Sequence, residues 1–252
     1  MRNLLATFIF IVAAASAAYA DIPMGESLNY RVMFKWGLVN KQAGHANIST
    51  SSLNDSLFRA ELIAASEKWA DMFFKVRDTL RGNIDLHSCE PSLYEKITHE
   101  GGEYKFDRIT YERNGNHVVG KGHRIHQKKP SKPITNREVL HEADGFTLDM
   151  LSSFYFMRSI RYDVMTPGDS IVTNIFSGSA KEELTITYVG QEDVEIDDTL
   201  YPTYHIRFRF TDDGGKVSSD DMDAWISSEP SKIPLKLEGK LVVGKVQCFL
   251  IP

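Results

Sequence analysis

The sequence predicts a mainly β protein, with a large curved antiparallel sheet or open barrel and one amphipathic helix packed against it. Apolar residues recur at every second position in several segments, which is the period of a strand with one buried face. Turns rich in Gly, Asn and Asp separate these segments, as in hairpins between antiparallel strands. One segment, residues 148–160, has helical spacing instead.

The chain opens with a pattern typical of a cleaved secretory signal peptide. Arg2 precedes an apolar run over residues 4–15, and Ala18 and Ala20 form a small-residue cleavage site. We expect residues 1–20 to be removed after Ala20, leaving residues 21–252 as a single β-rich domain in the periplasm or outside the cell. A retained N-terminal anchor is the alternative, but the apolar run is short for one. No later stretch approaches the roughly 20 apolar residues that span a bilayer.

The charge balance disfavours nucleic acid as a partner. The chain has 29 basic and 34 acidic residues, and loss of Arg2 with the leader leaves 28 against 34, a net charge of −6. This mild acidity is the opposite of a nucleic-acid-binding surface. Two cysteines, Cys89 and Cys248, remain for a compartment where disulfides persist, and the sequence leaves open whether they are bridged. Neither has ligand spacing for zinc, and no cofactor is expected.

The first strand is the clearest, because apolar side chains alternate with polar ones over residues 28–36. The same period returns over residues 204–210. Weaker alternation predicts strands over residues 57–63, 104–111, 184–189 and 233–237. We expect a meander of strands to about residue 125, a polar connection, the helix, and a second set of strands from Ser170 onward. Hairpin turns are expected at Gly101-Gly102, Asn114-Gly115-Asn116 and Asp212-Asp213-Gly214-Gly215.

Two segments break the strand pattern. Residues 67–74, EKWADMFF, predict a short helix or a bulged turn. Residues 148–160 carry Leu148, Leu151 and Phe154 at helical intervals, and a Pro-Gly pair at residues 167–168 follows as a typical stop.

The stretch GKLVVGKV, residues 239–246, resembles a phosphate-binding loop but fails as one. Val246 occupies the place of the Ser or Thr that binds magnesium. The residues after it alternate like a strand, whereas the motif must open a helix. We predict that Gly239 follows one strand, that residues 241–250 form the last strand, and that Gly244 marks a bulge or a close backbone approach.

A basic segment, residues 121–137, contains no acidic residue. Its candidate anion-binding residues are Arg124, Lys128, Lys129 and Lys132. Two interpretations are open: a site for phosphate, acidic glycans or acidic lipid head groups, or a solvated loop extended by its prolines.

Signals for metal binding and catalysis are weak. His123 and His126 are three residues apart, a spacing that places them on opposite faces of a strand. The acidic residues around residues 212–223 lack the ligand order of a calcium loop. The motifs Gly-x-Ser-x-Gly, Ser-x-x-Lys and His-Glu-x-x-His are absent from the sequence. We therefore name no catalytic or metal-binding residue.

Aromatic residues gather around the two segments that are not strands. Four of them are candidates for lining a pocket for an apolar ligand: Trp36, Trp69, Phe154 and Phe156. The alternative is that they form the core beneath the helix.

Four stretches together resemble an exported bacterial family known as domain of unknown function 3108. They are YRVMFKWGLVNKQAGHANIS at residues 30–49, DMLSSFYFMRSI at 149–160, TPGDSI at 166–171 and AWISSEPSKIPLKLEGKLVVGKVQCFL at 224–250. The resemblance covers nearly the whole chain after the leader and implies a secreted or periplasmic β-rich domain, with no established activity. The basic segment 121–137 departs from the family pattern.

These observations lead to one main functional hypothesis and one alternative. The main hypothesis is a non-enzymatic envelope protein, a β domain that binds an apolar or amphipathic ligand or a partner protein. Lipids, glycans and envelope proteins are the classes of partner considered. The alternative is a hydrolase acting on cell-envelope polymers, which requires a cleft with a perturbed His or carboxylate and a second polar group.

Overall fold

One sheet accounts for most of the protein. The computed structural model describes residues 22–217, 221–241 and 243–251, and within them 15 strands form a single sheet. The order is β8-β7-β6-β5-β4-β3-β2-β1-β15-β14-β13-β12-β11-β10-β9, which confirms the mainly β fold class. The first eight strands are β1 (Ser27–Trp36), β2 (Val39–Ser52), β3 (Leu57–Ser66), β4 (Val76–Asp85), β5 (Pro91–Glu100), β6 (Glu103–Asn114), β7 (His117–Gln127) and β8 (Thr135–Asp144).

The other seven strands belong to the second half of the chain. The first of them, β9, directly precedes the only α-helix of the described residues, and the other six follow that helix. The seven are β9 (Thr147–Leu148), β10 (Ser170–Phe176), β11 (Lys181–Ile196), β12 (Thr199–Asp212), β13 (Met222–Ser227), β14 (Pro234–Lys240) and β15 (Lys245–Leu250). Strands adjacent in sequence pair with each other, except β8 and β9, which are the two edges of the sheet, so each half of the sheet is a meander. β1 joins its two halves because it pairs with both β2 and β15. The pairs are antiparallel, apart from the short pair of β9 with β10.

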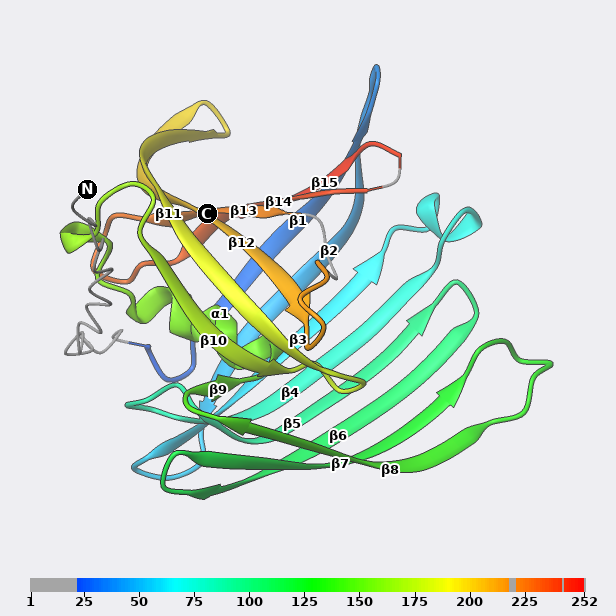
Figure 1. Cartoon of the computed structure of the whole chain (residues 1–252). Helices are drawn as coiled ribbons and strands as arrows, with labels where there is room; N and C mark the ends of the chain where they lie inside the picture. The colour runs from blue at the N-terminus through cyan, green and yellow to red at the C-terminus, as the bar shows by residue number, and fades with distance from the viewer. Residues whose placement is uncertain (1–21, 218–220, 242, 252) are drawn as a thin grey trace, which may run out of the picture.

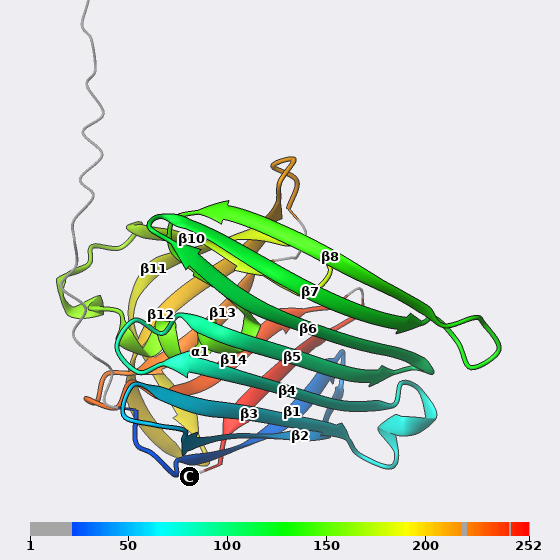
Figure 2. The same ribbon diagram turned by 90° about the horizontal axis from the view of Figure 1, so that it is seen from below.

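The sheet curls into a nearly closed barrel (Figures 1 and 2). Its edge strands are β8 and the two-residue β9, so the seam runs between β8 and the β9–β10 pair, where the described residues form no backbone ladder. Single contacts bridge the seam instead: Asn174 Nδ2 donates to the carbonyl of Asp144 at 2.9 Å, and His141 Nε2 lies 3.3 Å from the carbonyl of Gly178. This shape confirms the predicted curved sheet or open barrel.

The two ends of the barrel differ (Figures 1 and 2). At one end, here called the mouth, lie the β1–β2, β5–β6, β7–β8 and β14–β15 turns and the short 3-10 helix η1 (Ala70–Met72). The helix α1 (Met150–Ser159) lies inside the barrel toward the other, closed end. A second 3-10 helix, η2 (Tyr162–Val164), follows α1.

The helix α1 matches the predicted segment 148–160 but is buried more widely than an amphipathic surface helix. Seven of its ten residues are buried. Its N-terminus is closed by a capping box, in which Asp149 Oδ1 accepts from the N–H groups of Leu151 and Ser152 while Ser152 Oγ accepts from the N–H of Asp149. These bonds satisfy N–H groups that a helix start leaves unpaired.

The other end of α1 is fixed by a buried ion pair. The fully buried Arg158 donates to the two carboxylate oxygens of Glu26 at 2.6 and 3.0 Å, and also to the carbonyl of Ser231. A buried charge requires such a partner, because its hydration is lost. The pair ties the helix to the start of β1 and to the β13–β14 turn.

Two apolar clusters meet at α1. Phe154 and Tyr155 belong to a cluster built mainly from the inner faces of β1–β8, and Met157 belongs to one built from β10–β13. Phe156 and Met150 pack against both clusters. The helix therefore joins the two halves of the barrel.

Two expectations about the sheet need correction. The predicted polar connection contains strand β8, because residues 128–134 alone separate β7 from β8. The inner face of β8 carries His141 and its outer face the exposed Leu140, so the apolar alternation that marks a strand is lacking. The last strand begins at Lys245 rather than at residue 241, and Gly244, with φ +75°, lies in the preceding turn.

The structure does not describe residues 1–21, so the predicted signal peptide lies outside the described part. No helix among the described residues has both the length and the apolar character required to cross a bilayer.

Candidate functional site

An apolar groove of about 690 Å³ lies on the inner wall of the barrel at the mouth. We call it the mouth groove. Its size falls in the range of pockets that hold small ligands, about 300–1,000 Å³. It is lined by Val32, Phe34, Trp36, Val39, Ala43, Gly44, His45, Ala64, Ala65, Ser66, Trp69, Ala70, Phe73, Phe74, Val76, Leu241, Val243 and Val246.

Small residues create the space of the mouth groove. β1 supplies the large side chains of Phe34 and Trp36, which share a face because they are two residues apart. Opposite them, β2 and β3 present Gly44 and Ala64. A Cβ at Gly44 would lie 2.6 Å from the carbonyl oxygen of Ala65, so β2 and β3 approach closely there and a larger residue has no room.

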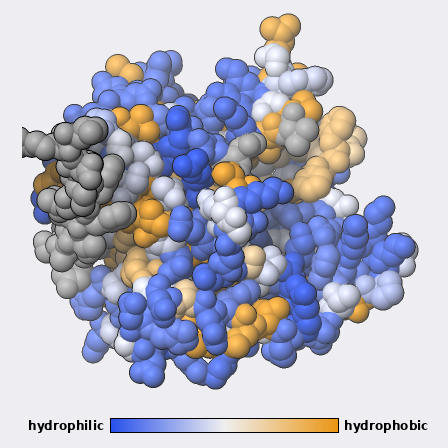
Figure 3. All heavy atoms as spheres, viewed as in Figure 1, coloured by the Kyte–Doolittle hydropathy of each residue, from blue (hydrophilic) through white to orange (hydrophobic). Residues whose placement is uncertain are grey.

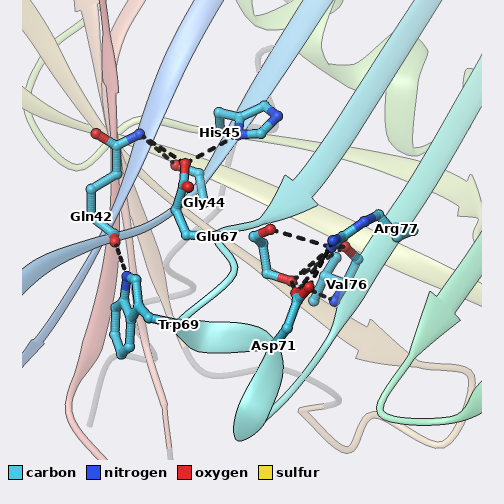
Figure 4. A network of polar contacts seen from close by, with 9 residues as sticks. Gln42, Gly44, His45, Glu67, Trp69, Asp71, Val76 and Arg77 are labelled. Atoms are coloured by element: carbon cyan, nitrogen blue, oxygen red, sulfur yellow. Dashed lines mark hydrogen bonds and ion pairs between the residues drawn. The ribbon is translucent and has the colours of Figure 1, made fainter.

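The loop between β3 and β4, which contains η1, forms the outer wall of the groove. The indole N–H of Trp69 donates to the carbonyl of Gln42 at 2.7 Å, and the Lys41 ammonium lies 4.4 Å from the centre of the Trp69 ring. Phe73 packs edge-on against Trp69, with the ring centres 6.3 Å apart. Figure 4 shows Trp69 held against β2 by the bond to Gln42.

A second set of polar contacts fixes the same loop to β4. Arg77 donates to both carboxylate oxygens of Asp71, at 3.1 and 2.7 Å, and Ser66 Oγ donates to Asp71 at 2.5 Å (Figure 4). These hydrogen bonds hold the pKa of Asp71 below its usual range. The aromatic wall of the groove is therefore attached firmly on both sides.

The mouth groove borders a polar strip on the inner face of β4–β6. Ala64, which lines the groove, is the register partner of Asp78, and Asp78 is the partner of Thr98. Strand alternation places Lys96 and Lys105 on the same inner face. Burial, together with the nearby charge of Glu100, raises the pKa of Asp78 to about 6. An apolar surface thus adjoins one that holds both acidic and basic groups.

The four predicted pocket residues fall in two places. Trp36 and Trp69 both line the mouth groove. Phe154 is buried in the core on α1, and the partly buried Phe156 packs against both apolar clusters, with its ring centre 5.0 Å from that of Phe146. The structure brings the two tryptophans together and separates them from the two phenylalanines.

The four predicted anion-binding residues also separate. Arg124 is buried on the inner face of β7, 3.4 Å from the Asp107 carboxylate. Lys128, Lys129 and Lys132 are exposed on the β7–β8 turn. Strand alternation turns Arg124 into the barrel, so it does not join the three lysines.

The two cysteines, and the neighbouring His123 and His126, do not line the mouth groove. Cys89 and Cys248 are both free, and burial raises the pKa of their thiols to about 12 and about 11. His123 and His126 face Asn136 and Glu103 respectively. Within the described residues, no group of three or more His, Cys, Asp or Glu side chains is arranged to hold a metal ion.

Sequence signals for the rest of the groove are weak. Phe73 and Phe74 stand in a segment marked as irregular by its pattern, but Ala43, Gly44 and Ala64 carry no signal of their own. Small residues in strands are common, and the space above them arises only when the sheet curves.

The fold and the groove define a class: a barrel-like β protein with an internal helix and an apolar groove at its mouth. The chain matches the family described as "Protein of unknown function (DUF3108)" over residues 29–250, and it belongs to this family. The resemblance seen in the sequence is thereby confirmed.

A solved structure has a similar fold. It is a beta-barrel-like protein of domain of unknown function DUF1849 from Brucella abortus, with a TM-score of 0.61 and 11% sequence identity, covering 90% of this chain and 96% of that one. At this identity the likeness concerns the fold alone. No curated protein matches the sequence.

Proposed function

We propose that this protein is an exported, non-enzymatic protein of the cell envelope that binds an apolar or amphipathic ligand in the mouth groove. The observation that carries the proposal is the groove itself, whose wall is formed almost entirely by apolar and aromatic side chains. Such a concave surface favours an apolar ligand, because binding removes apolar area from water on both partners.

The polar strip favours an amphipathic ligand over a purely apolar one. An apolar chain lying over Ala64 would bring its polar end toward Asp78 and Lys96. The strip offers both a carboxyl group and ammonium groups, so it can pair with a charged or zwitterionic head. Envelope lipids have this combination of chain and head group.

The proposed export rests on the sequence of the first 20 residues, which have the order of a signal peptide. An envelope location would bring the groove into a compartment rich in lipids and lipid-linked molecules.

The hydrolase alternative receives less support from the described side chains. It needs a base within reach of a nucleophile or a second catalytic group. The histidine that lines the mouth groove, His45, lies 3.4 Å from the Glu67 carboxylate, and among the described residues no Ser, Thr or Cys side chain hydrogen-bonds to its ring. The arrangement around His205, between Glu192 and Asp223, lies on the β11–β13 strands and away from the mouth groove.

A fluorescent fatty acid tests the proposal. The full chain is expressed with its own leader, the exported product is purified, and cis-parinaric acid is titrated against it. We expect saturable binding, and at least ten-fold weaker binding by Ala64→Phe, because the new ring would occupy the groove.

The matched control is Ile63→Phe, one residue earlier on the exposed outer face of β3. It should bind like the original protein. Absence of binding by the original protein, or equal binding by the two variants when both melt like the original, would contradict the proposal.

A further inference from the structure

Exposed apolar side chains are concentrated around the mouth. We call this group the apolar rim; it comprises Trp36, Leu38, Val39, Met72, Phe73, Phe74, Leu241 and Val243. It belongs to three neighbouring connections: the β1–β2 turn, the η1 loop and the β14–β15 turn. Hydrophobic residues are visible at the upper right of Figure 3, over the β1–β2 tip and the η1 loop. An apolar patch of this kind on a soluble domain marks an interaction surface.

The exposure of the rim is built into the fold. Met72 is 78% exposed and Phe73 80% exposed, although the loop that carries them is held by the contacts of Trp69 and Asp71 described above. Leu38 is fully exposed at the tip of its hairpin. Met72 and Phe73 are thus exposed on a loop whose backbone is held in place, so their exposure belongs to the fold.

Basic residues flank each apolar tip. They are Lys35 and Lys41 around the β1–β2 turn, Lys68 and Lys75 around η1, and Lys240 and Lys245 around the β14–β15 turn. All but Lys245 are exposed. Among the described residues, those five exposed lysines form no ion pair. Lys41 lies over the Trp69 ring, and the charges of Lys35, Lys68, Lys75 and Lys240 are available to an external anionic partner.

The rim continues into the basic β7–β8 turn. The Phe74 ring lies so close to Gly101 of the β5–β6 turn that a Cβ there would be 2.6 Å from it, and the neighbouring Gly102 faces Pro130. Beyond Pro130 lie the exposed lysines of the β7–β8 turn, among them Lys128 and Lys132. One arc of the mouth thus carries apolar tips, and its extension carries positive charge.

We propose that the apolar rim docks on the surface of a lipid bilayer that contains anionic lipids. The apolar tips enter the boundary between head groups and acyl chains, where Trp and Phe side chains are stable. The flanking lysines bind the lipid phosphates, their alkyl stems lying along the apolar boundary. Asp212 ends β12 and Asp213 follows it; neither belongs to the apolar rim, and Asp213 forms an ion pair with Lys181 at 3.2 Å.

Docking does not depend on a ligand in the mouth groove. It would, however, turn the opening of the groove toward the bilayer. A lipid chain could then pass between the membrane and the groove without crossing water, which connects the docking surface to the proposed function.

Flotation with vesicles tests the docking. The exported protein is mixed with vesicles of phosphatidylglycerol and phosphatidylcholine, or of phosphatidylcholine alone. We expect binding to the anionic vesicles, weaker binding to the neutral ones, and loss of binding as salt screens the lysines. The double variant Leu38→Asp/Met72→Asp should bind at least ten-fold more weakly, and Lys68→Glu/Lys75→Glu should lose the preference for anionic vesicles.

The control is Val164→Asp/Leu200→Asp, which places two charges on exposed apolar positions away from the mouth. It should bind vesicles like the original protein. The proposal is overturned if the original protein does not float, if the two double Asp variants float equally, or if the rim variants instead dissolve a dimer seen by sedimentation.

Leu38 and Met72 do not line the mouth groove. Their double variant should therefore still bind cis-parinaric acid. Conversely, Ala64→Phe should lose that ligand and keep vesicle binding, so failure of one proposal can be told from failure of the other.

Discussion

At the residue scale, Asp149 combines a structural task with an unfavourable environment. One carboxylate oxygen caps α1, while the other, Oδ2, is buried without a hydrogen-bond partner among the described residues. Burial raises the pKa of Asp149 to about 7, although the bonds from Leu151 and Ser152 act in the opposite direction. The charged form of this side chain is thus disfavoured inside the barrel.

This environment predicts a pH-dependent stability. In the unfolded chain Asp149 ionises near its ordinary pKa of 3.8, whereas the folded protein keeps the proton until about pH 7. The folded state therefore binds more protons in between, and its stability falls as the pH rises from about 4 to about 7. Asp149→Asn keeps a cap and removes the ionisation. Relative to the original protein, this variant should gain on the order of a few kcal/mol across that range.

Urea denaturation at a series of pH values measures this difference. Asp55→Asn, in the exposed β2–β3 turn, is the control. A stability difference between Asp149→Asn and the original protein that stays constant from pH 4 to pH 8 would show that Asp149 does not titrate in this way.

At the scale of elements, the stretch GKLVVGKV is a hairpin connection rather than a nucleotide motif. Gly239 and Lys240 end β14, Lys245 begins β15, and Gly244 turns the chain with φ +75°. A Cβ at Gly244 would overlap the carbonyl of Lys35 and lie 3.0 Å from Cβ of Trp36. The close backbone approach predicted for Gly244 is real, and it brings the β14–β15 turn against the β1–β2 hairpin.

Substitution of Gly244 should therefore cost more than substitution of a glycine in an open turn. At Gly115, with φ +61°, a Cβ would have no neighbouring atom within 4 Å, so Gly115→Ala should cost about 1 kcal/mol for the backbone conformation alone. Gly244→Ala adds a steric conflict and should cost roughly 2–4 kcal/mol. Denaturation of both variants measures the difference, and equal costs would refute the packing between the two hairpins.

The alternation in the sequence identified strands that have one apolar face. β1, β3, β6, β11, β12 and β14 were all expected. β8 was missed because its inner face includes His141 at the seam, where a ring can reach the carbonyl of Gly178. The pattern reports the contrast between two faces, and this contrast vanishes where an inner face is polar.

At the scale of the whole molecule, the candidate site arises from closure of the sheet. Trp36 and Trp69 were identified as aromatic residues near irregular segments, but their meeting depends on how β1 pairs with β2 and β2 with β3. Phe154 and Phe156 had the same sequence signal and lie in the core, because α1 enters the barrel. The sequence shows where aromatic residues stand in the chain, but the pairing of the strands and the position of the helix decide which of them line a groove.

The barrel should unfold as one unit, because α1 packs on both apolar clusters. Phe154→Ala removes a buried ring and should cost roughly 3–5 kcal/mol. Circular dichroism measures unfolding of the whole sheet. The fluorescence of a variant in which Trp225 is the only tryptophan measures unfolding of the second half of the barrel, to which β13 belongs. In Phe154→Ala, the midpoints of the two unfolding transitions should fall by the same amount. Phe73→Ala, at an exposed position on the η1 loop, should change neither midpoint. Two separate transitions, or a shift confined to one probe, would mean that the halves fold independently and that α1 does not couple them.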